Sequence, residues 1–362
     1  MDIDQVLEAM SERSASDVYL KCGSSPVLRV NGMLEPLDAP ALTDDDLERF
    51  AGALMTEHQQ RKFDDDPDLD VAYTAKNGSR YRVNSFRQQG HLGFVIRLVR
   101  VEDLSFQSLN LPDVVREFAE LRRGLVIITG ATGSGKSTTL AAMINHINNS
   151  FRKHIMTIED PIEYIHDDKL SIINQREVGF DTNSFGDALK HVVRQSPDVI
   201  LIGEMRDLET MITALSAAQT GHLVLSTMHT IDTAQTLDRI INYFPEHLKA
   251  QIRLELAACL EGVVCMRLLR RRSEPGRVPA LEIMRASPLV RKLLFSGETW
   301  RIPEVIKNGR QLGMQTFNQA LIALYQEGAV SFDDALAAST NPEEFKLNAQ
   351  GMYTGVDSIR EA

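Results

Sequence analysis

The sequence LVIITGATGSGKSTT, residues 125–139, decides the fold of this chain. Its first five residues are apolar and partly β-branched, so they predict a buried strand, and apolar residues at positions 140, 143, 144 and 147 predict a helix after the loop. Between them, residues 130–137 match G-x-x-x-x-G-K-[ST], the pattern of a loop that holds phosphate groups. An ordinary glycine-rich turn is the alternative, and eight matched positions in a strand-loop-helix context argue against it.

The glycines of this loop allow successive backbone N–H groups to point inward around a phosphate chain, and the following helix N-terminus adds partial positive charge. We expect Lys136 to reach the β- and γ-phosphates of a nucleotide, and the Ser137 hydroxyl to hold Mg²⁺. The loop residues expected to contact the nucleotide are Ala131, Thr132, Gly133, Ser134, Gly135, Lys136, Ser137 and Thr138.

Length and composition limit the classes of protein to consider. The chain has 362 residues, 43% of them hydrophobic, enough for a sizeable core divided among two or three domains. It shows no secretory leader and no long apolar run, so we expect a soluble cytosolic protein. Cys22, Cys259 and Cys265 lack C-x-x-C spacing, which argues against a zinc site or a disulfide framework. The net charge of −11 argues against a general nucleic-acid motor, without excluding one that has a local basic pore.

Residues 1–100 predict a small α+β domain. An apolar stripe near the N-terminus and a Thr43-capped acidic segment predict two helices. Asn77-Gly78 between two apolar runs predicts a hairpin with a type I′ turn. Residues 101–112 lack periodicity and end at a proline, so we place a linker there. Strands are expected at residues 17–20, 26–30, 69–74, 80–86 and 91–100.

Residues 113–286 alternate apolar strands with helical patterns, which predicts a largely parallel sheet with helices on both faces. Ligand groups should gather at the carboxyl ends of its strands. Residues 287–362 predict a helical region with a polar tail. Strands are expected at residues 125–129, 155–158, 199–202 and 223–227.

Two acidic motifs follow these strands. Glu159, Asp160 and Glu163 repel one another unless a cation or a hydrogen-bond donor offsets them, which suits a Mg²⁺-nucleotide site. When the motif stands alone, an ordinary solvated acidic turn is the favoured interpretation. Glu204 follows residues 199–202 in the position of a Walker B carboxylate. There it would orient or deprotonate the attacking water, or hold Mg²⁺ through water.

Histidine and arginine side chains supply further candidates. His222 and His229 bracket the strand expected at 223–227, where each could bind a phosphate or relay nucleotide state; a packed or surface histidine is the alternative. An arginine-rich run at 267–272 is interpreted as a solvated loop; the alternative is a docking patch for acidic lipid or protein. An arginine cluster on the last strands of the N-terminal domain is either solvated or the source of an arginine finger for a neighbouring subunit. Its members are Arg80, Arg82, Arg87, Arg97 and Arg100.

Four motifs in a fixed order resemble a known superfamily. The phosphate loop, TIEDPIE (157–163), LIGEMRD (201–207) and TGHLVLSTMHT (220–230) are similar to the Walker A, aspartate, Walker B and histidine boxes of the secretion ATPases of type II secretion and type IV pili. FRQQG (86–90), RIINYFP (239–245) and GMQTFNQAL (313–321) resemble the twitching-motility retraction ATPases, the PilT/PilU group. The resemblance extends from about residue 16 to residue 347.

The resemblance implies an α/β fold with a RecA-like P-loop ATPase core, an N-terminal PAS-like α+β domain and a helical C-terminal region, assembled as a homo-hexamer that hydrolyses ATP with Mg²⁺. Implied partners are an inner-membrane pilus platform protein and a paralogous retraction ATPase, with neither nucleic acid nor zinc. The implied location is cytoplasmic, at the inner membrane. Implied site residues are Lys136 and Ser137, the Walker B Glu204, the aspartate-box Glu163, the histidine-box His222 and His229, and Arg80, Arg82 and Arg97, whose action in cis or trans stays open.

Two features refine the expected function. Pilus-extension and secretion members of the superfamily carry an extra N-terminal domain and a four-cysteine zinc module; we expect neither in this protein, which favours retraction. LVRKLLFS at residues 289–296 replaces the signature of the principal retraction motor, and with GMQTFNQAL this favours the accessory PilU type. A pilus-assembly or type II secretion ATPase is the alternative within the superfamily. A nucleic-acid translocase, a small-molecule kinase and a non-hydrolysing assembly subunit are the alternatives from other classes.

Overall fold

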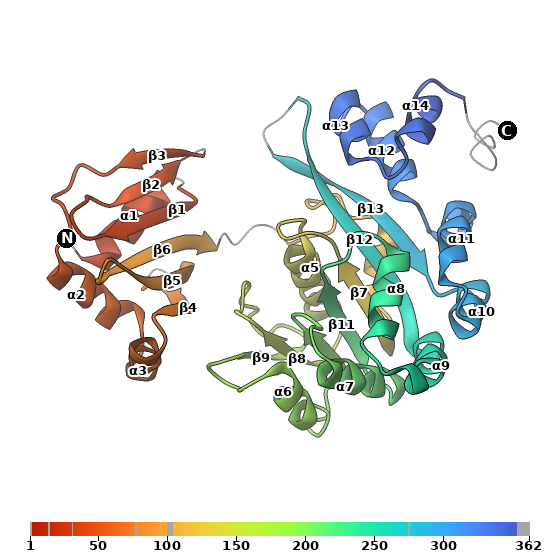
Figure 1. The fold of residues 1–362 in the computed structure, drawn as a ribbon, viewed down its shortest axis with the longest axis horizontal. Helices are drawn as coiled ribbons and strands as arrows, with labels where there is room; N and C mark the ends of the chain where they lie inside the picture. The colour runs from red at the N-terminus through yellow and green to blue at the C-terminus, as the bar shows by residue number, and fades with distance from the viewer. Residues whose placement is uncertain are drawn as a thin grey trace. The chain divides into compact units, whose positions relative to one another are not determined.

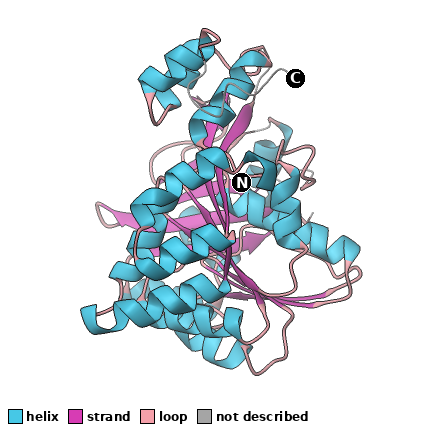
Figure 2. Ribbon diagram, turned by 90° about the vertical axis from the view of Figure 1, so that its right-hand side faces the viewer, coloured by secondary structure: helices cyan, strands magenta, loops and turns pink. Residues whose placement is uncertain are grey.

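The computed structural model describes residues 2–13, 15–30, 32–76, 78–99, 104–273 and 276–352. The chain divides into two compact units, one of Met1–Glu102 with Pro161–Tyr164 and one of Asp103–Asp160 with Ile165–Ala362 (Figure 1). Each unit is built on its own β-sheet with helices packed on it (Figure 2). The predicted α/β fold class is confirmed.

The first unit is a six-stranded antiparallel sheet in the order β3-β2-β1-β6-β5-β4. The predicted apolar stripe of α1 is buried in its core, and Thr43 caps α2 by accepting a hydrogen bond from Asp46 N. Neither β3 nor α3 is among the predicted elements, because β3 is a short, mostly exposed strand and α3 buries only Phe63. The elements are α1 Ile3–Glu12, β1 Asp17–Lys21, β2 Val27–Val30, β3 Met33–Pro36, α2 Asp44–Leu54, α3 Glu57–Asp65, β4 Asp68–Thr74, β5 Arg80–Gln88 and β6 His91–Val99.

The predicted hairpin between β4 and β5 is confirmed, but its turn differs from the predicted one. Gly78 N donates to Ala75 O at 2.9 Å, so Gly78 is the fourth residue of the turn, with φ +84°. A type I′ turn would place residues 77 and 78 at its two central positions. Asn77 itself lies outside the described residues.

The second unit is a seven-stranded sheet in the order β13-β12-β7-β11-β10-β8-β9, in which only the β12–β13 pair is antiparallel among the described strands. Alternate residues of β7 face opposite cores: Val126 packs with α4 and α5, and Ile127 packs with α6 to α9. The predicted parallel sheet with helices on both faces is therefore confirmed. Its strands are β7 Gly124–Thr129, β8 His154–Glu159, β9 Ile172–Glu177, β10 Val199–Ile202, β11 Leu223–Met228, β12 Leu260–Arg270 and β13 Arg277–Arg285; its helices are α4 Asp113–Ala119, α5 Lys136–Ser150, α6 Phe185–Val192, α7 Leu208–Gln219, α8 Thr233–Asn242 and α9 Lys249–Cys259.

The predicted linker at 101–112 is not free along its described part. Phe106 and Leu111 are buried in the core beneath α4 and α5, and Asn145 Nδ2 donates to Leu104 O at 3.2 Å. Residues 104–112 therefore pack as part of the second unit, while residues 101–103 lie outside the described part.

The C-terminal region is helical, as predicted, but shares the core of the second unit. Val290, Leu321 and Phe345 from three of its helices are buried with residues of α6 to α9. None of the described helices is both long and apolar enough to cross a membrane. The helices are α10 Pro288–Ser296, α11 Ile302–Asn308, α12 Phe317–Gln326, α13 Phe332–Ala338 and α14 Pro342–Ala349, with short 3₁₀ helices at Glu246–Leu248, Thr299–Arg301 and Arg310–Leu312.

The arginine run at 267–272 is only partly the solvated loop that its sequence favours. Arg267 and Arg270 belong to β12, and the half-buried Arg267 guanidinium stacks over the Phe317 ring at 3.9 Å from the ring centroid. Arg267 also donates to the Ala338 carbonyl. Its charge therefore holds the C-terminal helices to the sheet.

Candidate active site

The glycine-rich loop connects the carboxyl end of β7 to the first turn of α5. Three of its glycines have positive φ: Gly130 at +146°, Gly133 at +77° and Gly135 at +97°. A Cβ on Gly130 would lie 2.6 Å from the Met266 carbonyl oxygen, so a side chain cannot fit there. Gly135 is the N-cap of α5, and because glycine has no capping side chain, the first N–H groups of the helix remain available to an anion.

Lys136 is folded over its own loop. Its buried Nζ donates to Gly130 O at 2.9 Å and to Ala131 O at 3.1 Å, and it lies 3.4 Å from His229 Nδ1. Carbonyl acceptors of this kind can be exchanged for phosphate oxygens, to which an ammonium group binds more strongly because they carry charge. The lysine is therefore in reach of any phosphate that enters the loop.

Glu204 and His229 complete a cluster with Lys136. Glu204 Oε2 lies 3.1 Å from His229 Nε2 and 2.7 Å from Arg206 Nε, and the Glu204 side chain is only 16% exposed. His229 thus bridges the loop lysine and the acidic residue that follows β10. Parallel pairing of β7 with β11 and of β11 with β10 explains the meeting, because it brings the carboxyl ends of the three strands to one edge.

Buried hydroxyl groups hold these strand ends together. Thr129 Oγ1 donates to Thr230 O at 2.8 Å, and Thr227 Oγ1 donates to Gly203 O at 2.6 Å. Neither Thr129 nor Thr227 is among the site residues predicted from the sequence. A threonine inside an otherwise apolar strand is the signal that could have found them, because a buried hydroxyl needs a partner.

The loop residues fit a nucleotide with Mg²⁺. Ser134 Oγ is buried and has no hydrogen-bond partner in the described part of the chain, as expected for a group that serves a ligand. Ser137 begins the exposed side of α5, one residue after Lys136, where its hydroxyl can reach a metal ion. Lys136 provides positive charge and Glu204 provides a carboxylate on the two sides of His229.

His222 is not part of this cluster. It precedes β11, and its carbonyl oxygen accepts a hydrogen bond from Gly124 N at the beginning of β7. The phosphate loop follows the other end of β7, a strand of six residues that spans about 20 Å. The His222 ring instead lies 3.0 Å from Ala217 O through Nδ1, which indicates a role in the turn after α7. The expectation that His222 contacts nucleotide in the loop of its own chain is therefore not supported.

The remaining candidates lie in the first unit. Arg97 Nε donates to the buried Asp17 carboxylate at 2.8 Å, and Arg82 forms an exposed pair with Asp70 at 3.4 Å. Arg80 Nε donates to Ile162 O at 3.1 Å, within the segment that also contains Glu163. Their roles toward nucleotide stay predictions.

Comparison with known proteins identifies the family. Residues 1–320 match the model of a family described as "Type II/IV secretion system protein". The chain belongs to this family. It is 39% identical to the type IV pilus ATPase PilU of Pseudomonas aeruginosa over 347 residues, covering 96% of this chain and 91% of PilU. It is also 39% identical to the type IV pilus retraction ATPase PilT of the same organism over 345 residues, covering 95% and 100%.

A solved structure supports the same assignment. The pilus retraction motor PilT with bound ADP superposes on this secretion ATPase with a TM-score of 0.89, at 40% identity, covering 95% of this chain and 98% of PilT. The chain is therefore a secretion ATPase, as its four motifs predict, and it belongs with the PilT/PilU group that the segments at 86–90, 239–245 and 313–321 resemble. The similarity to PilU and to PilT is the same, so identity alone does not rank this secretion ATPase with either.

Proposed function

We propose that this secretion ATPase is a Mg²⁺-dependent motor that works as a homo-hexamer and drives the retraction of type IV pili. The observation that carries the proposal is the cluster of Lys136, His229 and Glu204 at the carboxyl edge of the sheet. Such a cluster places a phosphate-binding cation next to a carboxylate that can act on water. Relatives named for pilus retraction and twitching motility support the process.

Each residue of the cluster has a proposed step. ATP supplies the γ-phosphoryl group to be transferred, and Mg²⁺ offsets its charge. Lys136 exchanges its carbonyl acceptors at Gly130 and Ala131 for β- and γ-phosphate oxygens. Ser137 would hold Mg²⁺, and Glu204 would bind it through water. Glu204 orients the attacking water and accepts its proton, which His229 assists because it already contacts both charged groups.

Residues of the first unit supply the remaining charge in this proposal. Arg80, Arg82 and Arg97 neutralise negative charge on the phosphates, in cis or from a neighbouring subunit of the hexamer. Glu163 helps to position metal or water. In the single chain Arg97 is bound to Asp17, so it must exchange that partner to act on nucleotide.

ATP hydrolysis tests the site assignment. Lys136→Ala and Glu204→Gln should each lower kcat by at least about 10²-fold, the loss typical when a preorganised charge at the reacting phosphate is removed. Matched controls are Lys292→Ala and Glu304→Gln, which change the same residue types at exposed positions of α10 and α11. Glu204→Gln should still bind nucleotide, which shows that it is folded. Near-normal turnover in either site variant would refute the assignment.

Deletion of the gene tests the process. Retained or excess pili without twitching motility support retraction, whereas loss of pili supports the alternative of a pilus-assembly or secretion ATPase. ATPase activity that nucleic acid stimulates, with a steep salt dependence, would favour a translocase instead. Pulldown of the inner-membrane platform protein tests the partner.

We further propose that this chain is an accessory retraction ATPase of the PilU type, and not the principal retraction motor. The altered segment at 289–296, most of α10, and the sequence at 313–321 support it. Expression of this chain in a strain that lacks the principal retraction motor should then fail to restore twitching. Full restoration by this chain alone would assign it the principal rank.

A further inference from the structure

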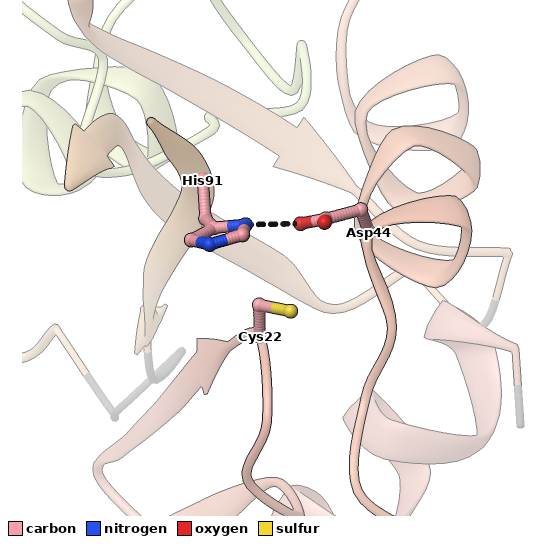
Figure 3. Close-up of side chains that lie close together, drawn as sticks. All are labelled: Cys22, Asp44 and His91. Atoms are coloured by element: carbon pink, nitrogen blue, oxygen red, sulfur yellow. Dashed lines mark hydrogen bonds and ion pairs between the residues drawn. The ribbon is translucent and has the colours of Figure 1, made fainter. Parts of the chain in front are cut away.

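Three metal-ligating side chains meet in the first unit, outside the ATPase motifs. Cys22 follows β1, Asp44 is the first residue of α2 and His91 is the first residue of β6. The Cys22 Sγ, an Asp44 carboxylate oxygen and a His91 ring nitrogen all lie within 4.8 Å of one another. Figure 3 shows the three side chains converging from three separate segments.

Backbone hydrogen bonds hold the three segments in place. β1 pairs with β6 as far as Lys21 and Gly93, which brings the end of one strand to the beginning of the other. Gly23 N donates to Leu42 O at 2.9 Å, which ties the turn after β1 to the segment before α2. The backbone positions of the three residues are therefore set by these hydrogen bonds and not by the interactions among their side chains.

We propose that Cys22, Asp44 and His91 bind one transition-metal ion of the Zn²⁺ class, with water as the fourth ligand. Sulfur, nitrogen and oxygen are the donor atoms that Zn²⁺ takes in tetrahedral sites, whereas Mg²⁺ and Ca²⁺ prefer oxygen alone. Asp44 and His91 are exposed, so solvent reaches the fourth position. A thiolate and a carboxylate together carry two negative charges, which match a divalent cation.

The geometry needs only small side-chain movements. Zn²⁺ bonds of about 2.0–2.3 Å place tetrahedral ligand atoms about 3.3–3.6 Å apart. His91 Nδ1 and Asp44 Oδ1 are 2.8 Å apart and must separate by roughly 0.5 Å on that scale. The distances from Cys22 Sγ to the other two ligand atoms are at most 4.8 Å, so they must shorten by about 1.2 Å at most. Rotations of three side chains on a fixed backbone provide such shifts.

Two alternative roles for the three side chains, an ion pair that stabilises the fold and a nucleophilic thiol, fit the structure less well than a metal site. The His91–Asp44 ion pair has side chains that are 47% and 56% exposed, and pairs exposed to this degree stabilise a fold very little. A nucleophilic cysteine needs a lowered pKa, but desolvation and the neighbouring Asp44 carboxylate raise the pKa of the Cys22 thiol. The thiol keeps its proton until a cation displaces it: the S–H bond breaks, the proton goes to solvent and the sulfur lone pair binds the metal.

Titration of the full-length chain with Co²⁺ tests the site. The protein is prepared without tags, nucleotide or Mg²⁺, so that none of them binds or competes with Co²⁺. Co²⁺ bound to a thiolate has a charge-transfer absorption that oxygen ligands in the phosphate loop cannot give. One Co²⁺ should bind per chain with this absorption, and Zn²⁺ should displace it. Cys22→Ser should abolish the absorption. His91→Ala should weaken Co²⁺ binding at least tenfold, since even outer-shell changes cost about 10- to 100-fold.

Controls separate this site from other ligands. His58→Ala removes an exposed imidazole from α3 of the same unit and should leave Co²⁺ binding unchanged. Cys259 and Cys265 are buried, and burial raises the pKa of the Cys259 thiol to about 12, so neither competes. Asp44→Asn is a second ligand variant in case Cys22→Ser does not fold. A wild-type chain without the thiolate absorption, or an absorption that persists in Cys22→Ser, would overturn the proposal.

Discussion

Two glycine-to-alanine substitutions in the phosphate loop test whether its geometry is what the nucleotide site needs. At Gly130 an added Cβ would lie 2.6 Å from the Met266 carbonyl oxygen and 2.6 Å from Ser134 Oγ, with φ at +146°. At Gly133 the added Cβ would meet nothing within 4 Å, with φ at +77°. The serine can rotate away, but the carbonyl oxygen belongs to the buried strand β12 and cannot.

The size of the expected effect follows from this difference. The peptide at Gly130 must move by roughly half an ångström to relieve the contact with Met266, and it carries the oxygen that holds Lys136 Nζ at 2.9 Å. Because misplacing a reacting group by about 1 Å costs about 10²-fold, Gly130→Ala should lower kcat/KM by about 10- to 10²-fold, equivalent to about 1.4–2.7 kcal/mol. Gly133→Ala should lower the free energy of unfolding by about 1 kcal/mol through its left-handed backbone and change kcat/KM less than about threefold.

Steady-state ATP hydrolysis measures the prediction, and thermal unfolding of both variants confirms that they are folded. Each variant serves as the control for the other, because both place one methyl group on the same loop. Equal losses of kcat/KM in the two variants would refute the reasoning, since the contact with Met266 would then not matter. A Gly130→Ala enzyme within about threefold of the wild type would refute it as well.

Three further predictions concern stability. Burial and Lys169 lower the pKa of His166 to about 4, so between pH 6.5 and 4 the imidazole is neutral in the folded chain and protonated in the unfolded chain. The free energy of unfolding should therefore fall by about 3 kcal/mol over this pH range. Urea titrations of His166→Asn should lack this pH-dependent loss of stability. Burial raises the pKa of Glu282 above its ordinary value of 4.5, so the free energy of unfolding falls as pH rises from 4.5 through the raised pKa. Glu282→Gln should therefore be more stable to urea than the wild type at pH 8, and this difference should disappear below pH 4.5. Phe345→Ala should lower the free energy of unfolding by about 3–5 kcal/mol, whereas Leu347→Ala on the same helix, at a side chain that is 40% exposed, should change it by less than about 0.5 kcal/mol; thermal unfolding measures both.

The sequence predicts that Lys136, Glu204 and His229 meet, because each comes soon after a buried strand. Lys136, Glu204 and His229 are separated widely in sequence, yet each lies just beyond the carboxyl end of a strand or in the loop that follows one. Parallel pairing brings such positions to one edge by geometry alone. For the same reason the structure does not bring His222 to this edge: it precedes its strand, and the two ends of a strand lie on opposite edges of the sheet. Its role toward nucleotide stays a prediction.

Features that depend on packing between distant segments could not be predicted. Spacing rules for metal ligands find pairs that are close in sequence, whereas Cys22, Asp44 and His91 meet only after β1 has paired with β6. Residues 104–112 are a second case in which packing could not be predicted. Their sequence lacks periodicity and so indicates a linker, but in the structure Phe106 and Leu111 are buried. A single apolar side chain that anchors an irregular segment leaves no periodic signal.

Hydrogen bonds connect the carboxyl edge of the sheet, where Lys136, His229 and Glu204 meet, to α8 and β13. Beyond His229, Thr230 Oγ1 pairs with Thr129 Oγ1 at 2.6 Å and with Thr236 Oγ1 of α8 at 2.7 Å. Thr233 N, at the beginning of α8, donates to Glu282 of β13 at 2.9 Å. Leaving a buried polar group unpaired costs about 1–3 kcal/mol, so these bonds hold the residue after His229 firmly to the beginning of α8. α8 packs against α9 and α11, which both pack against α10, so a chain of direct contacts runs from the segment after His229 to the altered segment at 289–296.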